Sequence, residues 1–295
     1  MGLSDRKLYL LAALLLVAAG AAIYLALKGP ADGVAESLGD LEVLASGRGT
    51  PEQIYGAMIR QGEKLEELAL KAALEHSESE TPLLRDGSAK ALGYFNDEAA
   101  FERLKAMVDD RDHSVRLAAI SGLGRRQDSK RVDELKKLAA RSDFDDRMRV
   151  AVYFNLYQAD SSAEGKAETV SKLIEFGDGA NAVVALEAVA ALTTLEPEKP
   201  AVLDLLRRKV GAANQEGALA VSIRHLATRE DTWIRQYLGR LSLYASPKVK
   251  IAVIQALHRV CPDDRWSIIE DFLGAEVPEE VLRTAIEELR FLGGS

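Results

Sequence analysis

The sequence predicts an all-α protein, an α-solenoid of stacked helix pairs that follows an N-terminal transmembrane helix. Three features predict this. The 295-residue chain is 47% hydrophobic but only 6% aromatic, a balance that favours helix over a β-sandwich or barrel. One stretch near the N-terminus runs for twenty residues without a charge. Along the remainder, one apolar pattern returns seven times, which is typical of a stacked repeat.

The uncharged stretch is residues 8–27, LYLLAALLLVAAGAAIYLAL. As a helix it would be about 30 Å long, the thickness of a bilayer core. Tyr9 and Tyr24 lie near its ends, where amphipathic rings are favoured at the headgroup level. A cleaved secretory signal and a buried core helix are the alternatives, but a signal has an apolar stretch of only about 7–15 residues. The length therefore favours a transmembrane signal anchor.

The charges that flank the stretch predict its orientation. Arg6 and Lys7 stand in the short N-terminal tail, residues 1–7, against Lys28 on the other side. This excess keeps the N-terminus cytoplasmic and places the repeat domain outside the cytoplasm, in the periplasm of a bacterium. Residues 28–49, rich in Gly, Ala and acids, are expected to form a linker with at most one weak helical turn.

Net charge and cysteine content exclude several classes of function. The chain has a net charge of −8 although residues 1–30 are at +2, so the remainder is strongly acidic. Nucleic acid is therefore not an expected partner of the folded part. Cys261 is the only cysteine, which excludes an internal disulfide framework and any CxxC zinc or redox site.

The repeat is defined by seven leucines spaced 31 to 36 residues apart: Leu92, Leu123, Leu156, Leu192, Leu226, Leu257 and Leu289. Positions eight, four and three before each leucine are apolar or small, and all fall on one face of a helix. A second amphipathic stretch lies between consecutive copies, so each unit is a helix pair that buries its face only by stacking. The repeat domain is expected over residues 81–295, after capping helices over residues 50–80 that open with the capping box Thr50-Pro51-Glu52-Gln53.

Helix starts are predicted eleven residues before each leucine. The residues there are Thr81, Asp112, Asp145, Asn181, Gln215, Ser246 and Pro278. Five of these are strong N-cap residues, and Thr81 and Ser246 are each followed by proline, which is preferred at the first helical position.

Residues 109–124, DDRDHSVRLAAISGLG, resemble the HEAT-like repeat, with an Asp in the turn, an apolar-Arg pair four residues on, and a Leu-Gly exit. Residues 144–156 and 246–257 resemble it nearly as well, and the resemblance extends over about residues 81–292. It implies a scaffold for protein interactions. A minority of the relatives are bilin-attaching lyases.

The motifs of common catalytic and cofactor sites do not occur in the sequence. HExxH, GxxxxGK[ST], GxGxxG and GxSxG are missing, and no two of the four histidines stand at i,i+3 or i,i+4. His225 and His258 come from adjacent repeats but lack further ligands at fixed spacing. We therefore expect no enzyme activity, no metal and no cofactor.

Two sets of residues are candidates for binding a partner. The first is Trp233, Tyr237, Arg240 and Tyr244, which form a second stripe on a helix predicted over residues 231–245. Aromatic residues with Arg are enriched in protein contacts, although core packing is the interpretation that the pattern favours.

The second set is basic and stands seven residues before four of the leucines: Arg85, Arg116, Arg149 and Lys250. Arg116 and Arg149 would line a groove for an acidic tail, or would pair with Asp112 and Asp145 at i,i+4 and tie turn to helix. The pattern favours the structural interpretation. The short basic clusters at 125–131 and 207–209 are expected to be solvated.

Together these features predict a membrane-anchored, non-catalytic scaffold that binds another protein. An enzyme-like relative such as a bilin lyase, or a structural subunit of a membrane complex, is the alternative.

Overall fold

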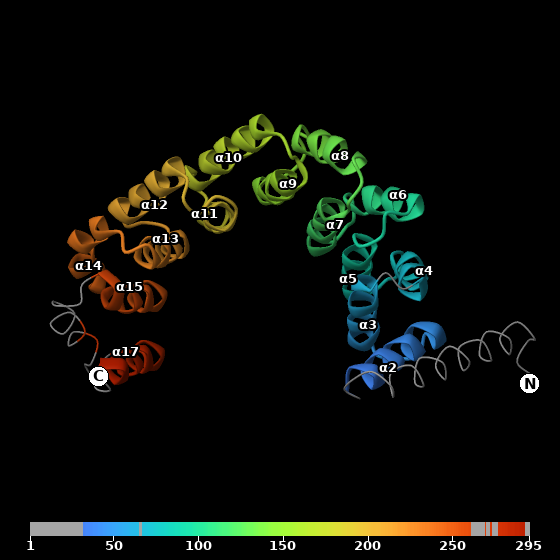
Figure 1. The fold of residues 1–295 in the computed structure, drawn as a ribbon, viewed down its shortest axis with the longest axis horizontal. Coiled ribbons are helices and arrows are strands. Elements are labelled where there is room, and N and C mark those ends of the chain that lie inside the picture. Colours follow the sequence, from blue (N-terminus) through green and yellow to red (C-terminus); the bar gives the residue numbers. More distant parts are fainter. Residues whose placement is uncertain (1–31, 65–66, 261–268, 270–271, 273–276, 293–295) are drawn as a thin grey trace, which may run out of the picture. The chain divides into compact units, whose positions relative to one another are not determined.

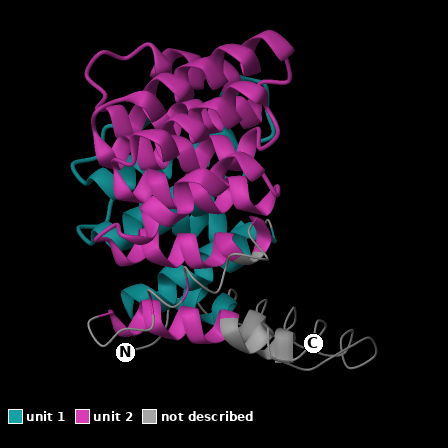
Figure 2. Ribbon diagram, turned by 90° about the vertical axis from the view of Figure 1, so that its left-hand side faces the viewer, with its two compact units in different colours: residues 1–131 teal, residues 132–295 magenta. Residues whose placement is uncertain are grey.

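The computed structural model describes residues 32–64, 67–260, 269, 272 and 277–292. Every element among these residues is a helix, and no strand occurs among them. The prediction of an all-α repeat fold is therefore confirmed for this part of the chain. The chain divides into two compact units, residues 1–131 and residues 132–295, drawn in two colours in Figure 2.

Unit 1 contains six helices among its described residues: α2 (Asp32–Ser46), α3 (Pro51–Glu63), α4 (Glu67–His76), α5 (Pro82–Leu92), α6 (Glu98–Met107) and α7 (His113–Arg125). Helices α3, α5 and α7 pack in series as one layer, and α4 and α6 cover them as the second (Figure 1). Each first helix of a pair thus contacts the first helix of the next pair.

Unit 2 has the same two-layer plan. Its elements are α8 (Lys130–Ala139), which begins at the end of unit 1, α9 (Asp146–Ala159), α10 (Ala163–Asp178), α11 (Ala182–Leu195), α12 (Pro200–Ala212), α13 (Glu216–Thr228), η1 (Thr232–Ile234), α14 (Arg235–Ser242), α15 (Pro247–Val260) and α17 (Glu279–Leu292). Helices α9, α11, α13, α15 and α17 pack in series, while α10, α12 and α14 form the other layer (Figure 1).

The predicted helix starts are confirmed. Each of the seven positions directly precedes a helix of the first layer. Asp112, Asp145 and Asn181 accept main-chain N–H bonds with their side chains, as N-cap residues do. Gln215 instead takes a left-handed conformation with φ of 55°, and its side chain bonds to Lys209 and to the Gly179 carbonyl.

The predicted core face is largely buried. The six reference leucines whose side chains are described are at most 7% exposed, and so are all residues eight and four positions before the seven leucines. Two residues three positions before differ from the prediction. Tyr153 is half-buried and packs at the edge of the core with its ring 6.1 Å from that of Phe176. Ile286 is 40% exposed because it lies on α17, after which no described helix follows to cover that face.

The linker expected over residues 28–49 differs from the structure, because residues 32–46 of it form helix α2. Its residue Asp40 is buried, and Arg60 of α3 donates two hydrogen bonds to its carboxylate at 2.8 and 2.6 Å, with a third from Gln61 at 2.9 Å. The Arg60 hydrogen bonds lower the pKa of Asp40. This helix is held to α3 by polar contacts, which a search for apolar periodicity does not detect.

The membrane-spanning helix predicted for residues 8–27 lies outside the described residues, as does the tail over residues 1–7. Across the described part of the chain, no helix has both the length and the apolar character needed to cross a bilayer.

Two glycines have a structural reason at the contact of α5 with α7: Gly93, in the Leu-Gly pair that ends α5, and Gly122, one residue before the reference leucine of α7. A Cβ on Gly93 would stand 2.6 Å from the Gly122 Cα, and a Cβ on Gly122 would stand 2.6 Å from the Ala89 carbonyl oxygen. Both obstacles are backbone atoms that cannot turn away. Only glycine therefore permits this close approach of the two helices.

Candidate functional site

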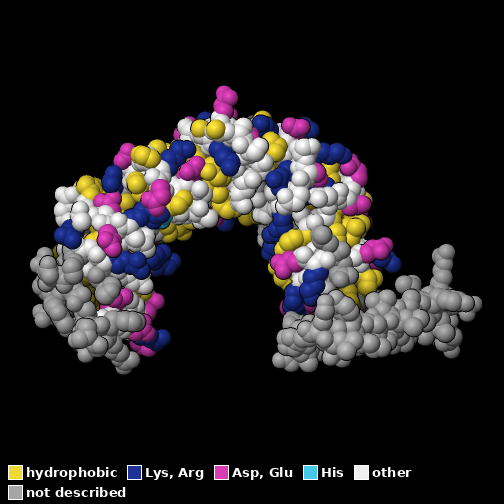
Figure 3. Space-filling model, in the orientation of Figure 1, with side chains coloured by type: hydrophobic (Ala, Val, Ile, Leu, Met, Phe, Trp, Pro, Cys, Tyr) yellow, Lys and Arg dark blue, Asp and Glu magenta, His cyan; other side chains and the backbone are white. Residues whose placement is uncertain are grey.

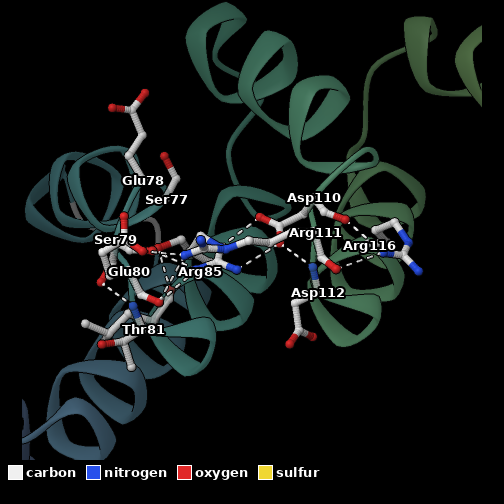
Figure 4. Close-up of polar contacts among 12 residues, drawn as sticks. Ser77, Glu78, Ser79, Glu80, Thr81, Arg85, Asp110, Arg111, Asp112 and Arg116 are labelled. Carbon is white, nitrogen blue, oxygen red and sulfur yellow. Dashed lines mark hydrogen bonds and ion pairs between the residues drawn. The ribbon is translucent and has the colours of Figure 1, made fainter.

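A cluster of charged side chains occupies the repeat turns of unit 1 (Figure 4). At its centre, Arg85 is only 4% exposed. Its Nε and one terminal nitrogen donate to the two carboxylate oxygens of Asp110 at 2.8 and 2.9 Å, and the other nitrogen donates to the carbonyls of Ser79 and Glu80. Such a bidentate pair fixes both distance and orientation, so Arg85 joins one turn to the next.

Asp110 is shared between that pair and the start of α7. Its carboxylate also accepts the main-chain N–H of Asp112 at 2.8 Å. Burial raises the pKa of Asp110, but the hydrogen bonds from Arg85 and from the Asp112 amide outweigh it, and the pKa lies below the usual 3.8. The carboxylate is therefore ionised at neutral pH and committed to the fold.

Arg116, at the same position in the next repeat, also donates to main-chain carbonyls of its own turn, as Arg85 does. It donates to the carbonyls of Asp110 and Arg111 at 2.8 and 3.3 Å and lies 3.1 Å from a ring nitrogen of His113. The expected partner, Asp112, accepts instead from the amide and hydroxyl of Ser114. The carboxylate of an N-cap residue is occupied by its own helix, so it does not turn toward Arg116.

Arg149 occupies the corresponding position on α9 in unit 2. It lies 3.5 Å from the Asp146 carboxylate and 3.4 Å from the Ser142 carbonyl, and it is half-buried. The Asp145 carboxylate caps α9 through the Met148 amide at 2.9 Å. Arg116 and Arg149 are thus each bonded to their own turn and lie in different units.

Three of the aromatic-stripe candidates, Trp233, Tyr237 and Arg240, lie on η1 and α14. We call the layer of unit 2 that contains α10, α12 and α14 its outer layer. The rings of Trp233 and Tyr237 are 4.6 Å apart, and both are half-buried against the core. The Arg240 guanidinium stands 5.3 Å from the Tyr237 ring and donates to the Gly211 carbonyl at 3.1 Å. One side of this surface, Trp233, Tyr237 and Arg240, therefore supports the fold while the other stays open to solvent.

Tyr244 is not part of the same helix. The helix predicted over residues 231–245 begins as the 3-10 turn η1, continues as α14 and ends at Ser242. Pro247 opens the next helix, and proline disfavours helical conformation in Ser246 directly before it, so α14 cannot continue into α15 without a break. Tyr244 lies in this short connection, half-buried against the core.

Sequence reasoning missed two buried cations, Arg126 and Lys209. Arg126, expected to be solvated, is 1% exposed, donates to the carbonyls of Phe95 and Asp97, and forms an ion pair with Asp128. The acid two residues after the arginine was the available signal. Lys209 is likewise 6% exposed and bonded to Gln215.

Histidines of the described chain do not gather into a site. The Nε2 of His225 lies 3.1 Å from the Pro197 carbonyl, and burial lowers the pKa of this imidazole. The side chain of His258 is outside the described part. Among the residues that are described, no three His, Cys, Asp or Glu side chains stand close enough together to hold a metal ion.

The described helices and their packing define an all-α helical-repeat protein. The HEAT repeat family matches residues 67–156, which supports the HEAT-like assignment over those repeats. The comparison with curated proteins gave no match.

The comparison with solved structures found several similar chains at low identity. The Escherichia coli protein YibA is 16% identical over 82% of this chain and 97% of its own, with a TM-score of 0.46. The CpcE–CpcF complex of phycocyanin lyase from a Nostoc species is 18% identical over 90% of this chain and 96% of that one, with a TM-score of 0.42. Human deoxyhypusine hydroxylase in complex with glycerol is 13% identical over 90% of this chain and 100% of its own, with a TM-score of 0.37. These likenesses do not extend to activity or partners.

Proposed function

We propose that this chain is a non-catalytic scaffold that binds another protein through the surface formed by Trp233, Tyr237 and Arg240. The observation behind the proposal is the ring pair of Trp233 and Tyr237, which packs on the core with one side and faces solvent with the other. Large aromatic side chains with an adjacent arginine are the commonest anchors of protein interfaces. Because each helix of a solenoid contacts only its neighbours, a partner can bind the outer layer without disturbing the core.

The proposal also places the scaffold at a membrane. The twenty uncharged residues 8–27 would anchor it, with the N-terminus cytoplasmic and the repeats outside the cytoplasm. The intact protein is then expected to stay with membranes after carbonate extraction. A mature N-terminus at residue 21 or later would instead show a cleaved signal.

The test of the surface is co-purification of cross-linked partners in mild detergent. Trp233→Ala with Tyr237→Ala is expected to remove the partner. The matched control is Tyr153→Ala with Phe176→Ala, another half-buried ring pair packed on the same core. Both variants should lose similar stability, since both remove aromatic packing, but only the first should lose the partner. Equal recovery from the two variants would contradict the proposal.

Removal of residues 1–31 distinguishes the proposed scaffold from the alternative, a purely structural subunit of a membrane complex. A scaffold that binds through α14 should recover the same partner without the anchor. A structural subunit held chiefly through residues 8–27 should lose every contact. An enzyme-like relative, such as a bilin lyase, would instead convert a bound small molecule, which absorbance spectroscopy would detect.

A further inference from the structure

A groove of about 320 Å³ opens between the first-layer helices at the end of unit 2. Arg224 and Thr228 of α13 line one wall, and Gln255 and Arg259 of α15 line the other. Ala227 and Ala256, both almost fully buried, form the floor between them. The small floor residues leave room for a chain to lie between the two walls.

The two arginines in this groove differ from most others in the molecule. Among the arginines that the structure describes, four have side chains that form no hydrogen bond or ion pair with another described residue: Arg48, Arg224, Arg235 and Arg259. Two of these four lie in the groove, and both are exposed. The Gln255 amide is also exposed and forms no hydrogen bond within the described chain. The groove therefore presents donors that the fold does not use.

The charge around the groove is opposite to that of the whole protein. Helices α13 and α15 together contain four basic residues, Arg224, Lys248, Lys250 and Arg259, against one acid, Glu216. The chain as a whole has a net charge of −8. Figure 3 shows dark blue side chains over α13 and α15 and magenta ones over α17. A local cationic field on an acidic protein attracts an anionic ligand.

Spacing of the two guanidinium groups indicates the form of that ligand. Arg224 stands two residues before its reference leucine and Arg259 two residues after its own, so they are offset by four residues, about 6 Å along the helices. With packed helices about 8–10 Å apart, the two Cα atoms are about 11 Å from one another. An extended peptide places side chains about 7 Å apart on one side, so two acidic residues lie within reach of both arginines.

We propose that this groove binds an extended acidic peptide segment, with Arg224 and Arg259 donating to its carboxylates and Gln255 to its main chain or side chains. This inference rests on the proposed function in one respect only, that the chain binds another polypeptide. The groove lies between α13 and α15 of the first layer, whereas Trp233 and Tyr237 belong to η1 and α14. Arginine is suited to this role because its planar fork donates two parallel hydrogen bonds to one carboxylate.

Glu288 of α17 lines the far edge of the groove. Its charge disfavours an anion on that side, so the acidic segment lies toward α13 and α15. The net charge of the chain makes a polyphosphate ligand such as nucleic acid the weaker candidate, since long polyanions are repelled by the rest of the surface.

The experiment is a fluorescence anisotropy titration of the full chain in mild detergent with a labelled peptide of six glutamates. The same peptide with six glutamines is the neutral control. Wild-type protein is expected to bind the glutamate peptide and not the glutamine peptide, with affinity falling as salt rises. Arg224→Ala with Arg259→Ala should weaken binding at least tenfold, because each change removes a charge-assisted contact.

The matched control is Arg48→Ala with Arg235→Ala, which removes the same charge from the two unpaired arginines outside the groove. It should leave the affinity within twofold. An equal loss in the two double variants, or no binding by wild type, would overturn the proposal, as would tighter binding of a DNA oligonucleotide of equal charge. The Trp233 and Tyr237 variant should still bind the peptide, so failure of the outer surface and failure of the groove are distinguishable.

Discussion

Arg85 in unit 1 and Arg224 in unit 2 are the same residue type within one repeat pattern, but they have different environments and different roles. Arg85 stands seven residues before its reference leucine, is 4% exposed and donates to Asp110 and to two carbonyls. Arg224 stands two residues before its own leucine, is exposed and has no partner among the described residues. The fold uses the Arg85 side chain to support a turn, whereas the Arg224 side chain faces the proposed ligand.

The largest effect should come from breaking the register that underlies this comparison. Leu226→Asp, two residues after Arg224, places an unpaired charge in a fully buried position and should cost several kcal/mol of unfolding free energy. Arg224→Asp on the exposed face should change it by only about 0.5 kcal/mol. Urea denaturation measures both. Similar losses from the two changes would mean that the face is assigned wrongly.

Next in size is the removal of the buried arginine. Arg85→Ala should cost about 3–5 kcal/mol, because it leaves the Asp110 carboxylate charged and without its main partner. Arg224→Ala should stay within about 0.5 kcal/mol. A double-mutant cycle with Asp110→Ala would show the pairwise energy, and a coupling near zero would argue against the bidentate pair.

Glycine-to-alanine substitutions can test how closely helices pack at one position in each unit. Gly122→Ala should cost about 1–3 kcal/mol, because the new methyl group meets the Ala89 carbonyl and the helices must separate. Gly239→Ala on α14 has nothing within 4 Å and should stabilise the protein by up to about 1 kcal/mol through helix propensity. Thermal unfolding distinguishes them, and a destabilising Gly239→Ala would contradict the open placement of that residue.

The smallest expected effect is on acid stability. The folded-state pKa of Asp110 lies below its usual 3.8, so its stabilising contribution is complete above that pH and is lost as pH falls through the lowered value. Asp110→Asn should reduce stability at pH 7 and make the fall in stability below about pH 4 shallower. Urea midpoints measured across this range test it. An unchanged acid slope would show that Asp110 does not titrate with unfolding.

Repeat positions could be predicted from the sequence because each is set by local chemistry. An Asp or Asn that caps a helix and a core leucine eleven residues later follow from local helix chemistry, and Asp112 and Leu123 lie as that pattern predicts. The Trp233 and Tyr237 pair was recognisable as a second stripe, although the early end of α14 removed Tyr244 from it.

Contacts between distant residues could not be predicted in the same way. Arg85 bonds to a carboxylate 25 residues along the chain, and Asp40 to an arginine 20 residues along, so neither pair leaves a local signal. Arg126 lies in a basic run that resembles a solvated surface, yet its side chain is 1% exposed, donates to the Phe95 carbonyl and forms an ion pair with Asp128. The groove became visible only when α13 and α15 were placed side by side.

The central claim is that Arg85 stabilises the fold whereas Arg224 and Arg259 bind a ligand. The most direct test is to measure the urea midpoint with and without saturating six-glutamate peptide. A ligand at 100 times its Kd adds about 2.7 kcal/mol to the free energy of unfolding if it binds only the folded state. Arg85→Lys should have a lower midpoint and keep the peptide-induced increase, while Arg224→Ala with Arg259→Ala should keep the midpoint and lose the increase. If Arg85→Lys loses the increase and the groove variant retains it, the account is contradicted.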